Sequence, residues 1–438
     1  MDGAVPEARS MPFRHVAAVT VGNALEFYDF TTYAFFALYI GRAFFPSATP
    51  GTSLLLSLAT FGAGFLTRPI GAMIIGPLGD KIGRKPAFLF SFVLMGISMA
   101  GLALTPSYAR IGMAAPILVV SFRLLQGFAL GGEVGPTTAY MVEAAPPSRR
   151  GFYASLQYAS QDAAGLTAGI LSTVLANILS AGQLADWGWR AVLLFGTAVV
   201  PFGLWLRHNL PETLHAADDA ALAPDGTVGL LTVRTSLRPY GRIIVLGLLI
   251  LGYGSVCTYT LNYMTTYALD TLHLPAAESF GVIIANGLAW VAFDLVSGLL
   301  SDRFGRKPVM LAGTALLLLS IVPAFWLIGH YRSIVIFYSA SIWMVTLAAL
   351  GQTPMVVSLT ESVPRHIRSG VVATVYAFAI SIFGGSTQFI ISWLIGQTGN
   401  PLAPAFYWSA VTAIGLLAIL GLRESAPTLR RRRGQGRS

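Results

Sequence analysis

Seven ionisable side chains stand inside long apolar stretches of this sequence, and their types suggest proton and anion chemistry. They are Glu26, Asp29, Arg68, Arg123, Glu133, Asp162 and Asp294. An ionisable group at bilayer depth is costly unless it is paired or hydrated, so such groups usually serve a function. Carboxylates at this depth can carry protons, and a guanidinium can hold an anionic ligand.

The spacing of these residues suggests separate roles for them. Glu26 and Asp29 are three residues apart and share one face of a helix. Two carboxylates that close cannot both ionise cheaply, so one of them is expected to hold a proton. Arg123 is the first candidate for a substrate carboxylate, because a guanidinium fork binds bidentately and keeps its charge. Arg68 is the second candidate, or else a structural partner of Asp29 or Glu133.

The composition indicates that these groups are carried by a membrane protein. The chain has 438 residues, of which 55% are hydrophobic and 11% charged, and its mean hydropathy is +0.67. A soluble domain has roughly 25% charged residues. Helices of about 20 apolar residues can cross a bilayer. Such runs predict an all-α protein with twelve spans, near 13–38, 53–77, 87–105, 114–140, 152–179, 189–207, 242–268, 279–300, 308–329, 333–358, 370–393 and 403–422.

The basic residues predict how the spans are oriented. With both termini inside, the cytoplasmic segments hold 22 of the 28 Lys and Arg residues and the outer loops hold four. We therefore interpret the net charge of +9 as a match for anionic lipid headgroups and exclude nucleic acid as a partner. The predicted organisation is an N-terminal half at 1–207, a cytoplasmic linker at 208–241, a C-terminal half at 242–422 and a basic tail at 423–438.

The two halves repeat the same loop pattern. Gly76-Pro-Leu-Gly-Asp80-Lys-Ile-Gly83-Arg84-Lys85-Pro86 returns as Gly298-Leu-Leu-Ser-Asp302-Arg-Phe-Gly305-Arg306-Lys307-Pro308. Glu143 followed by Arg150 likewise returns as Glu361 followed by Arg368. Each copy follows the second or fourth span of its half. Such agreement predicts a duplicated six-helix unit, as in one class of transporters.

The loop motif Gly-x-x-x-Asp-x-x-Gly-Arg-Lys resembles the signature of the major facilitator superfamily. The resemblance implies a cytoplasmic latch that stabilises the outward-open state and breaks during alternating access. Its predicted members are Gly76, Asp80, Gly83, Arg84, Glu143, Arg150, Asp302, Arg306, Glu361 and Arg368. The resemblance also implies that spans 1, 4, 7 and 10 line a central cavity, which would surround it with Glu26, Asp29, Arg123 and Glu133.

A narrower resemblance covers almost the whole chain. Gly22-Asn23-Ala-Leu-Glu26-Phe-Tyr28-Asp29-Phe30 and Arg123-Leu-Leu-Gln126-Gly127 look like patterns of the metabolite:proton symporter family, closest to its citrate-proton symporters. This implies uptake of a small organic anion with protons. The predicted substrate-binding residues are Arg123, Arg68, Asn23, Tyr28, Gln126, Gln157, Gln161 and Gln352, and the predicted proton-coupling residues are Glu26, Asp29 and Glu133. Each polar residue alone is more often an interhelical hydrogen-bond partner. Asp162 and Asp294 lie outside the family pattern and receive no defined role, although they argue against a simple one-proton picture and could alter the choice of substrate or ion.

Other functions fit the sequence less well. A proton symporter of a zwitterionic osmolyte such as betaine or proline, or of a monocarboxylate such as shikimate, is the main alternative. No heptad pattern follows the last span, which favours the organic acid. A membrane enzyme is disfavoured because five of the six His residues lie outside the spans, His15 stands at the start of the first span, and no nucleophile motif is present. The single Cys257 excludes an internal disulfide. We expect no cofactor, no metal, a monomer, and a bacterial inner-membrane location.

Overall fold

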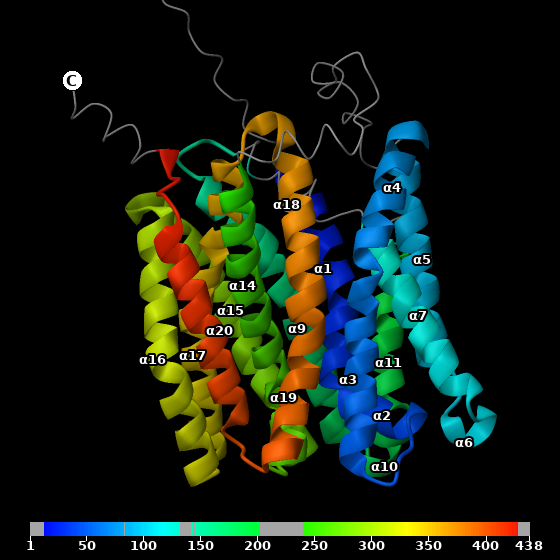
Figure 1. Cartoon of the computed structure of the whole chain (residues 1–438). Coiled ribbons are helices and arrows are strands. Elements are labelled where there is room, and N and C mark those ends of the chain that lie inside the picture. Colours follow the sequence, from blue (N-terminus) through cyan, green and yellow to red (C-terminus); the bar gives the residue numbers. More distant parts are fainter. Residues whose placement is uncertain are drawn as a thin grey trace, which may run out of the picture.

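The computed structural model describes residues 13–82, 84–131, 142, 145–198, 200–201 and 240–427, and all regular structure within these ranges is helical (Figure 1). The N-terminal helices are α1 (Phe13–Phe35), α2 (Ala37–Phe44), α3 (Pro50–Leu66), α4 (Arg68–Ile82), α5 (Arg84–Leu104), α6 (Tyr108–Ile111), α7 (Ala114–Leu130), α9 (Arg150–Ile178), α10 (Ala181–Gln183), η1 (Leu184–Gly188), α11 (Trp189–Phe195) and η2 (Gly196–Ala198). The C-terminal helices are α14 (Gly241–Thr266), η4 (Tyr267–Thr271), α15 (Ala276–Phe304), α16 (Arg306–Tyr331), α17 (Ile334–Ser362), α18 (Arg365–Ala379), η5 (Ile380–Gly384), α19 (Gly385–Thr398) and α20 (Ala403–Gly421).

Described helices occupy each of the twelve stretches that the hydropathy predicts, although parts of the fourth and sixth stretches lie outside the described residues, and some of the stretches are interrupted. The first span breaks between α1 and α2, the second between α3 and α4, and the eleventh widens at η5 before it continues as α19. Seven described helical stretches are long and apolar enough to cross a bilayer by length and composition alone. Predicted spans 1 and 5 are not among them. They carry several of the polar and charged residues singled out above.

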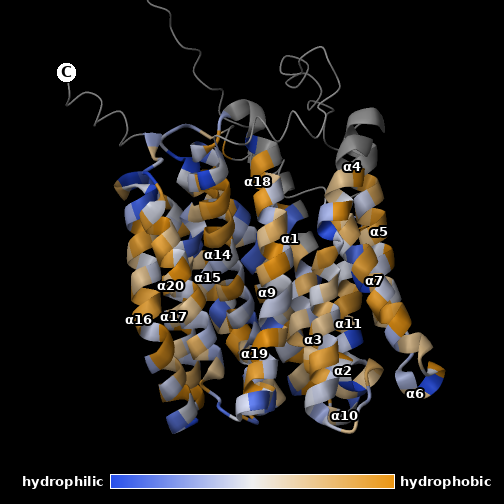
Figure 2. Cartoon of the chain, viewed as in Figure 1, coloured by the Kyte–Doolittle hydropathy of each residue, from blue (hydrophilic) through white to orange (hydrophobic). Residues whose placement is uncertain are grey.

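The outer surface of the bundle is apolar, as a lipid-facing surface must be. Figure 2 shows hydrophobic residues along the middle of the helices and hydrophilic residues toward their ends. Large apolar side chains such as Leu319 on α16, Val335 on α17 and Leu417 on α20 are about 70% exposed. Side chains of this kind can remain uncovered by protein only where lipid replaces water.

Two seams join the N-terminal and C-terminal helices through small residues. Along the first seam α9 packs against α15, and a Cβ atom on Gly298 would stand 2.5 Å from the Ser155 hydroxyl and 2.8 Å from the Gly151 carbonyl. Along the second seam α3 packs against α19, and a Cβ on Gly62 would overlap the carbonyl of Gly385. Glycine is needed at these positions because the two backbones approach so closely.

Aromatic rings add a contact between the halves near one end of these helices. The Phe280 ring of α15 lies 4.9 Å from the Phe36 ring, measured between centroids, and 6.3 Å from the Tyr39 ring of α2. The other end of α15 reaches the first turn of α9 through Asp302, as described below. The halves therefore meet on both sides of the central region.

Candidate functional site

Two neighbouring cavities of about 70 Å³ each lie between the halves. Both are lined by Phe27, Gln161, Asp162, Thr258, Tyr259 and Trp290. The walls come from α1, α9, α14, α15, α17 and α18, and the second cavity also touches η5 at Ile380. Spans 1, 7 and 10 thus line the cavities as the family resemblance implies, together with spans 5, 8 and 11. Neither cavity has a lining residue from α7 of span 4, which carries Arg123.

Arg123 lies behind the cavity wall, in a cluster with Asp29 and aromatic rings. Its Nη1 atom donates to Asp29 Oδ2 at 3.3 Å and also to Gln126 Oε1, which is one helical turn away. Its guanidinium carbon stands 4.3 Å from the Tyr33 ring centroid and 4.5 Å from that of Phe30. Both charged side chains are almost fully buried. The structure therefore brings Arg123 to Asp29, the partner that a buried guanidinium needs.

This cluster leaves some guanidinium hydrogen-bonding capacity unused. The Nε and Nη2 atoms of Arg123 are buried without a partner among the described residues. Arg68 lies beside the same cluster, with its guanidinium carbon 4.4 Å from the Phe30 centroid and 4.5 Å from that of Phe65. Phe30 itself lines the first cavity. One aromatic ring therefore separates two guanidinium groups from the space between the halves.

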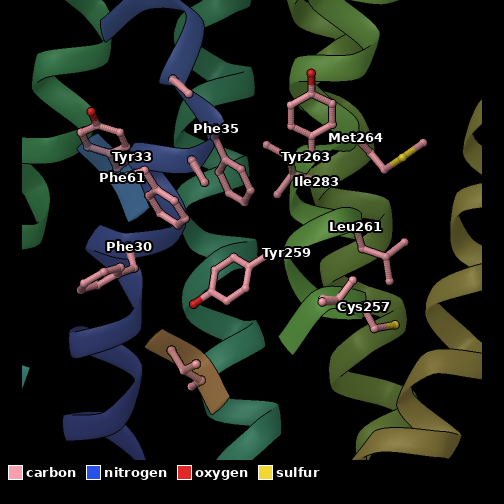
Figure 3. Close-up of a cluster of buried hydrophobic side chains, with 14 of the residues drawn as sticks. Phe30, Tyr33, Phe35, Phe61, Cys257, Tyr259, Leu261, Tyr263, Met264 and Ile283 are labelled. Atoms are coloured by element: carbon pink, nitrogen blue, oxygen red, sulfur yellow. The ribbon is translucent and has the colours of Figure 1, made fainter. Parts of the chain in front are cut away.

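The close-up of this wall shows how aromatic side chains of the two halves meet. Figure 3 places Phe30 of α1 opposite Tyr259 of α14, while Cys257 and Leu261 lie on the other side of α14. Tyr259 lies 5.5 Å from the Phe65 ring of α3, measured between centroids, in an edge-to-face arrangement. Such edge-to-face pairs contribute about 0.5–1.5 kcal/mol beyond the area that they bury.

Several predicted substrate ligands are instead engaged in bonds between helices. Asn23 of α1 donates to the Gln157 carbonyl at 3.0 Å and to the Ser160 hydroxyl at 2.9 Å, and it accepts from Gln161 at 3.3 Å. The Tyr28 hydroxyl donates to a carbonyl of α11 at 2.8 Å. Asn23 and Tyr28 line neither cavity. Their observed bonds hold α1 against α9 and α11.

Two predicted substrate ligands do line the cavities, Gln161 and Gln352. Gln352 of α17 is buried, its Oε1 accepts from Thr258 at 3.0 Å, and its Nε2 has no partner among the described residues. Gln126 is buried beside Arg123, and Gln157 is buried on α9; neither lines a cavity. Gln352 thus lines the second cavity with an amide nitrogen that has no oxygen or nitrogen partner among the described residues.

The structure describes only part of the predicted proton pathway. Asp29 forms the pair with Arg123, whereas Glu133 and the side chain of Glu26 lie outside the described residues. The carboxyl groups that do line a cavity are Asp162 and Asp294, for which the sequence suggested no role. Their isolation inside apolar runs was the available signal, but nothing in the spacing showed that they would meet.

The described part of the predicted latch is a network at one end of α15 and α17. Asp302 accepts from the backbone N–H groups of Gly151 at 2.8 Å and Phe152 at 2.9 Å, so a carboxylate of one half caps a helix of the other. Arg306 bonds Asp302 at 2.6 Å and Glu361 at 3.3 Å. A longer ion pair, 4.0 Å between Arg150 Nη1 and Glu361 Oε1, joins the two halves.

The remaining latch residues contribute differently. Arg368 donates from Nε to the Val363 carbonyl at 3.3 Å. The described residues do not include Gly83 and Glu143. They also leave out the side chains of Asp80 and Arg84 and the surroundings of Gly76. Glu424, which the sequence did not single out, accepts from the backbone N–H groups of Arg306 and Lys307 at 3.0 Å each.

The described residues hold no cluster of His, Cys, Asp and Glu side chains that could bind a metal ion. The polar features of the site are therefore a buried guanidinium cluster, a pair of cavity carboxyls and amide groups. Such groups can bind protons and small polar solutes without a cofactor.

Comparison with known proteins places this arrangement among transporters. A family model described as Major Facilitator Superfamily matches residues 19–387. A citrate-proton symporter of Klebsiella pneumoniae is 35% identical over 416 residues, which cover 94% of this chain and 93% of that relative. A proline/betaine transporter of Escherichia coli (strain K12) is 33% identical over 426 residues, which cover 94% of this chain and 83% of that relative.

Solved structures share the fold at lower identity. The crystal structure of a D-xylose-proton symporter superposes with a TM-score of 0.74 at 19% identity, covering 95% of this chain and 98% of that one. A human organic anion transporter superposes with a TM-score of 0.60 at 18% identity, covering 95% of this chain and 100% of the other. At such identities the likeness concerns the fold alone.

Proposed function

Because the chain belongs to the major facilitator superfamily, we propose that it is a proton-coupled symporter that takes up a small organic anion by alternating access. Citrate or a related di- or tricarboxylate is the proposed substrate. Relatives that are named as citrate-proton symporters support this choice. Membership of a transporter family also favours transport over catalysis.

The observation that carries the proposal is the buried Arg123 guanidinium beside the cavity wall. It stacks on Phe30, which lines the first cavity, and it pairs with Asp29 through Nη1 alone. Its Nε and Nη2 atoms have no partner among the described residues, so they can donate to both oxygens of a substrate carboxylate once the Phe30 ring moves.

A second candidate is a zwitterionic solute such as betaine or proline. Trp290 and Tyr259 line both cavities and offer aromatic faces for a quaternary ammonium group. Relatives named as proline/betaine transporters support this alternative.

The proposed cycle begins with a proton at Asp29, assisted by Glu26 and Glu133. Protonation of Asp29 removes the partner of Arg123, which then binds the substrate carboxylate. The loaded carrier rocks inward, and release of the substrate lets Arg123 recapture Asp29 and expel the proton. Gln161 and Gln352 would hold the polar part of the substrate in the cavity. Asn23, Tyr28, Gln126 and Gln157 would hold the helices that form the site.

The latch and the topology complete the proposal. Asp302, Arg306 and Glu361 would close the cytoplasmic side, and the basic residues at that side would orient both termini toward the cytoplasm. The two halves at 1–207 and 242–422 would then rock about the seams. We propose a monomer in a bacterial inner membrane, in contact with anionic lipid headgroups and with no nucleic-acid partner.

Uptake into proteoliposomes tests this function. Labelled citrate, 2-oxoglutarate, shikimate and betaine are offered to the purified protein with and without an inward proton gradient. We expect citrate or 2-oxoglutarate to accumulate only with the gradient, and Arg123→Ala to abolish substrate binding. Accumulation of betaine alone would favour the second candidate. Failure of all proton-driven uptake would rule out symport of these solutes.

A further inference from the structure

Asp162 and Asp294 face each other across the seam between the halves. Asp162 belongs to α9 and Asp294 to α15, and both side chains line the second cavity. Asp294 is 1% exposed, and its Oδ2 atom has no hydrogen-bond partner among the described residues. Two carboxylates that share a buried cavity cannot both ionise cheaply, so one of them is expected to hold a proton.

No fixed cation neutralises this pair. Among the described residues, neither Asp162 nor Asp294 takes part in an ion pair, and no Lys, Arg or His lines either cavity. The titratable groups that face the pair are Tyr158 of α9, Tyr376 of α18 and Tyr259 of α14, and none of these is basic. The packed surfaces of α1 and α17 contribute Phe27, Gln352 and Met355. A proton is therefore the cation that this environment requires.

A neighbouring hydroxyl gives a second, independent indication. The Thr353 Oγ1 atom lies 2.7 Å from Asp294 Oδ1 and 2.8 Å from the Ala349 carbonyl. A hydroxyl has one hydrogen and cannot donate fully to two acceptors. Both contacts are satisfied when Asp294 is protonated and donates to Thr353, which then donates to Ala349. The unpartnered Nε2 of Gln352 lines the same cavity, so the site can also hold a polar molecule that delivers the proton.

We propose that Asp162 and Asp294 form a proton-binding site between the halves, in which a bound proton holds α9 against α15. The helix pair that carries this site also carries the latch, since Asp302 lies eight residues beyond Asp294 and caps the first turn of α9. Eight residues of helix span about 12 Å. Loss of the proton leaves two facing carboxylates, which repel and separate the seam. Proton binding at this site thus controls whether the halves close.

Infrared spectroscopy tests the site without any substrate. Purified protein in liposomes is titrated from low to high pH, and the C=O band of protonated carboxyl groups is recorded. We expect Asp162→Asn/Asp294→Asn to lack part of the band that the unmodified protein shows, because the substituted pair has no carboxyl to protonate. Asp186→Asn removes an exposed carboxyl group that lines neither cavity and is the matched control, and the variants are compared by the band that persists at neutral pH. An undiminished band in the double variant would overturn the proposal.

A transport assay distinguishes a loss of proton coupling from a loss of folding. This assay rests on the proposed symport function. In proteoliposomes, Asp162→Asn and Asp294→Asn should keep substrate exchange at equal concentrations within about twofold of the unmodified protein. Accumulation driven by a proton gradient should fall at least tenfold. Unchanged accumulation would refute the coupling role. If the unmodified protein moves none of the offered substrates, the proposed function fails, and the infrared result alone decides whether the proton site exists.

Discussion

Substitution of Asp302 by Ala should open the cytoplasmic side of the protein. The carboxylate accepts two hydrogen bonds that cross between the halves, from Gly151 at 2.8 Å and from Phe152 at 2.9 Å. Its third bond, to Arg306, remains within the C-terminal half and does not hold the halves together. Only the first two bonds therefore count toward closure.

The size of the effect follows from these two bonds. A hydrogen bond to a charged group contributes about 1.5–3 kcal/mol. The Asp302 side chain is 10% exposed, so the lower end of this range applies. Two such bonds give about 3 kcal/mol, which corresponds to roughly a 150-fold change in the ratio of closed to open states.

Thiol labelling from the cytoplasmic side measures this ratio. Ser255 lines the second cavity and is 8% exposed, so Ser255→Cys in a Cys257→Ser background reports on access. In inside-out membrane vesicles, a membrane-impermeant maleimide should react about 100-fold faster when Asp302→Ala is present. Asp186→Ala serves as the matched loss of a carboxylate and should leave the rate unchanged. A rate within threefold of the parent in Asp302→Ala would refute the reasoning.

Three further predictions test other contacts. Arg123→Gln should lower the free energy of unfolding by about 3–5 kcal/mol, because Asp29 is left buried without a partner. Adding Asp29→Asn should restore the unfolding temperature but not uptake. Normal uptake by the double variant would exclude Arg123 as a substrate ligand. Gly298→Val should open the α9–α15 seam and speed the labelling reaction, whereas Gly396→Val, which meets nothing within 4 Å, should not. Tyr28→Phe should lower the free energy of unfolding by about 1 kcal/mol and leave the KM for substrate unchanged, since the Tyr28 hydroxyl donates to a backbone carbonyl away from both cavities. A raised KM would contradict this placement.

The span pattern could be predicted from the sequence because lipid imposes a simple requirement. Every crossing must be a helix of nearly fixed length, so hydropathy alone locates it. The breaks were not predictable in the same way. Thr67, between α3 and α4, is followed by Arg68 and Pro69, and this proline is a signal for a break. Ile380, at the start of η5, lies in a run as apolar as its neighbours, and its backbone geometry depends on the helices packed against it.

The candidate site was predicted less completely, for a related reason. Residue type shows which side chains are costly in a membrane, and this drew attention to Asp29 and Arg123, which form a buried ion pair. It does not show which helix face points inward when the helix is apolar on all sides. Asn23 and Tyr28 were grouped with the substrate site for this reason, although their bonds join helices. Asp162 and Asp294 belong to different halves, so their contact depends on tertiary packing.

The contact between Gly62 and Gly385 has a mechanical consequence. At Gly62 and Gly385 the backbone of α3 lies directly on the backbone of α19, and nearby the Ser381 hydroxyl donates to the Phe65 carbonyl at 2.8 Å. Where two glycines meet, the helices can turn or slide against each other without a change of side-chain rotamer. The energy barrier of the transport cycle would then arise from other contacts. Gly62→Ala, which adds a single methyl group, should slow turnover and leave the affinity for substrate unchanged.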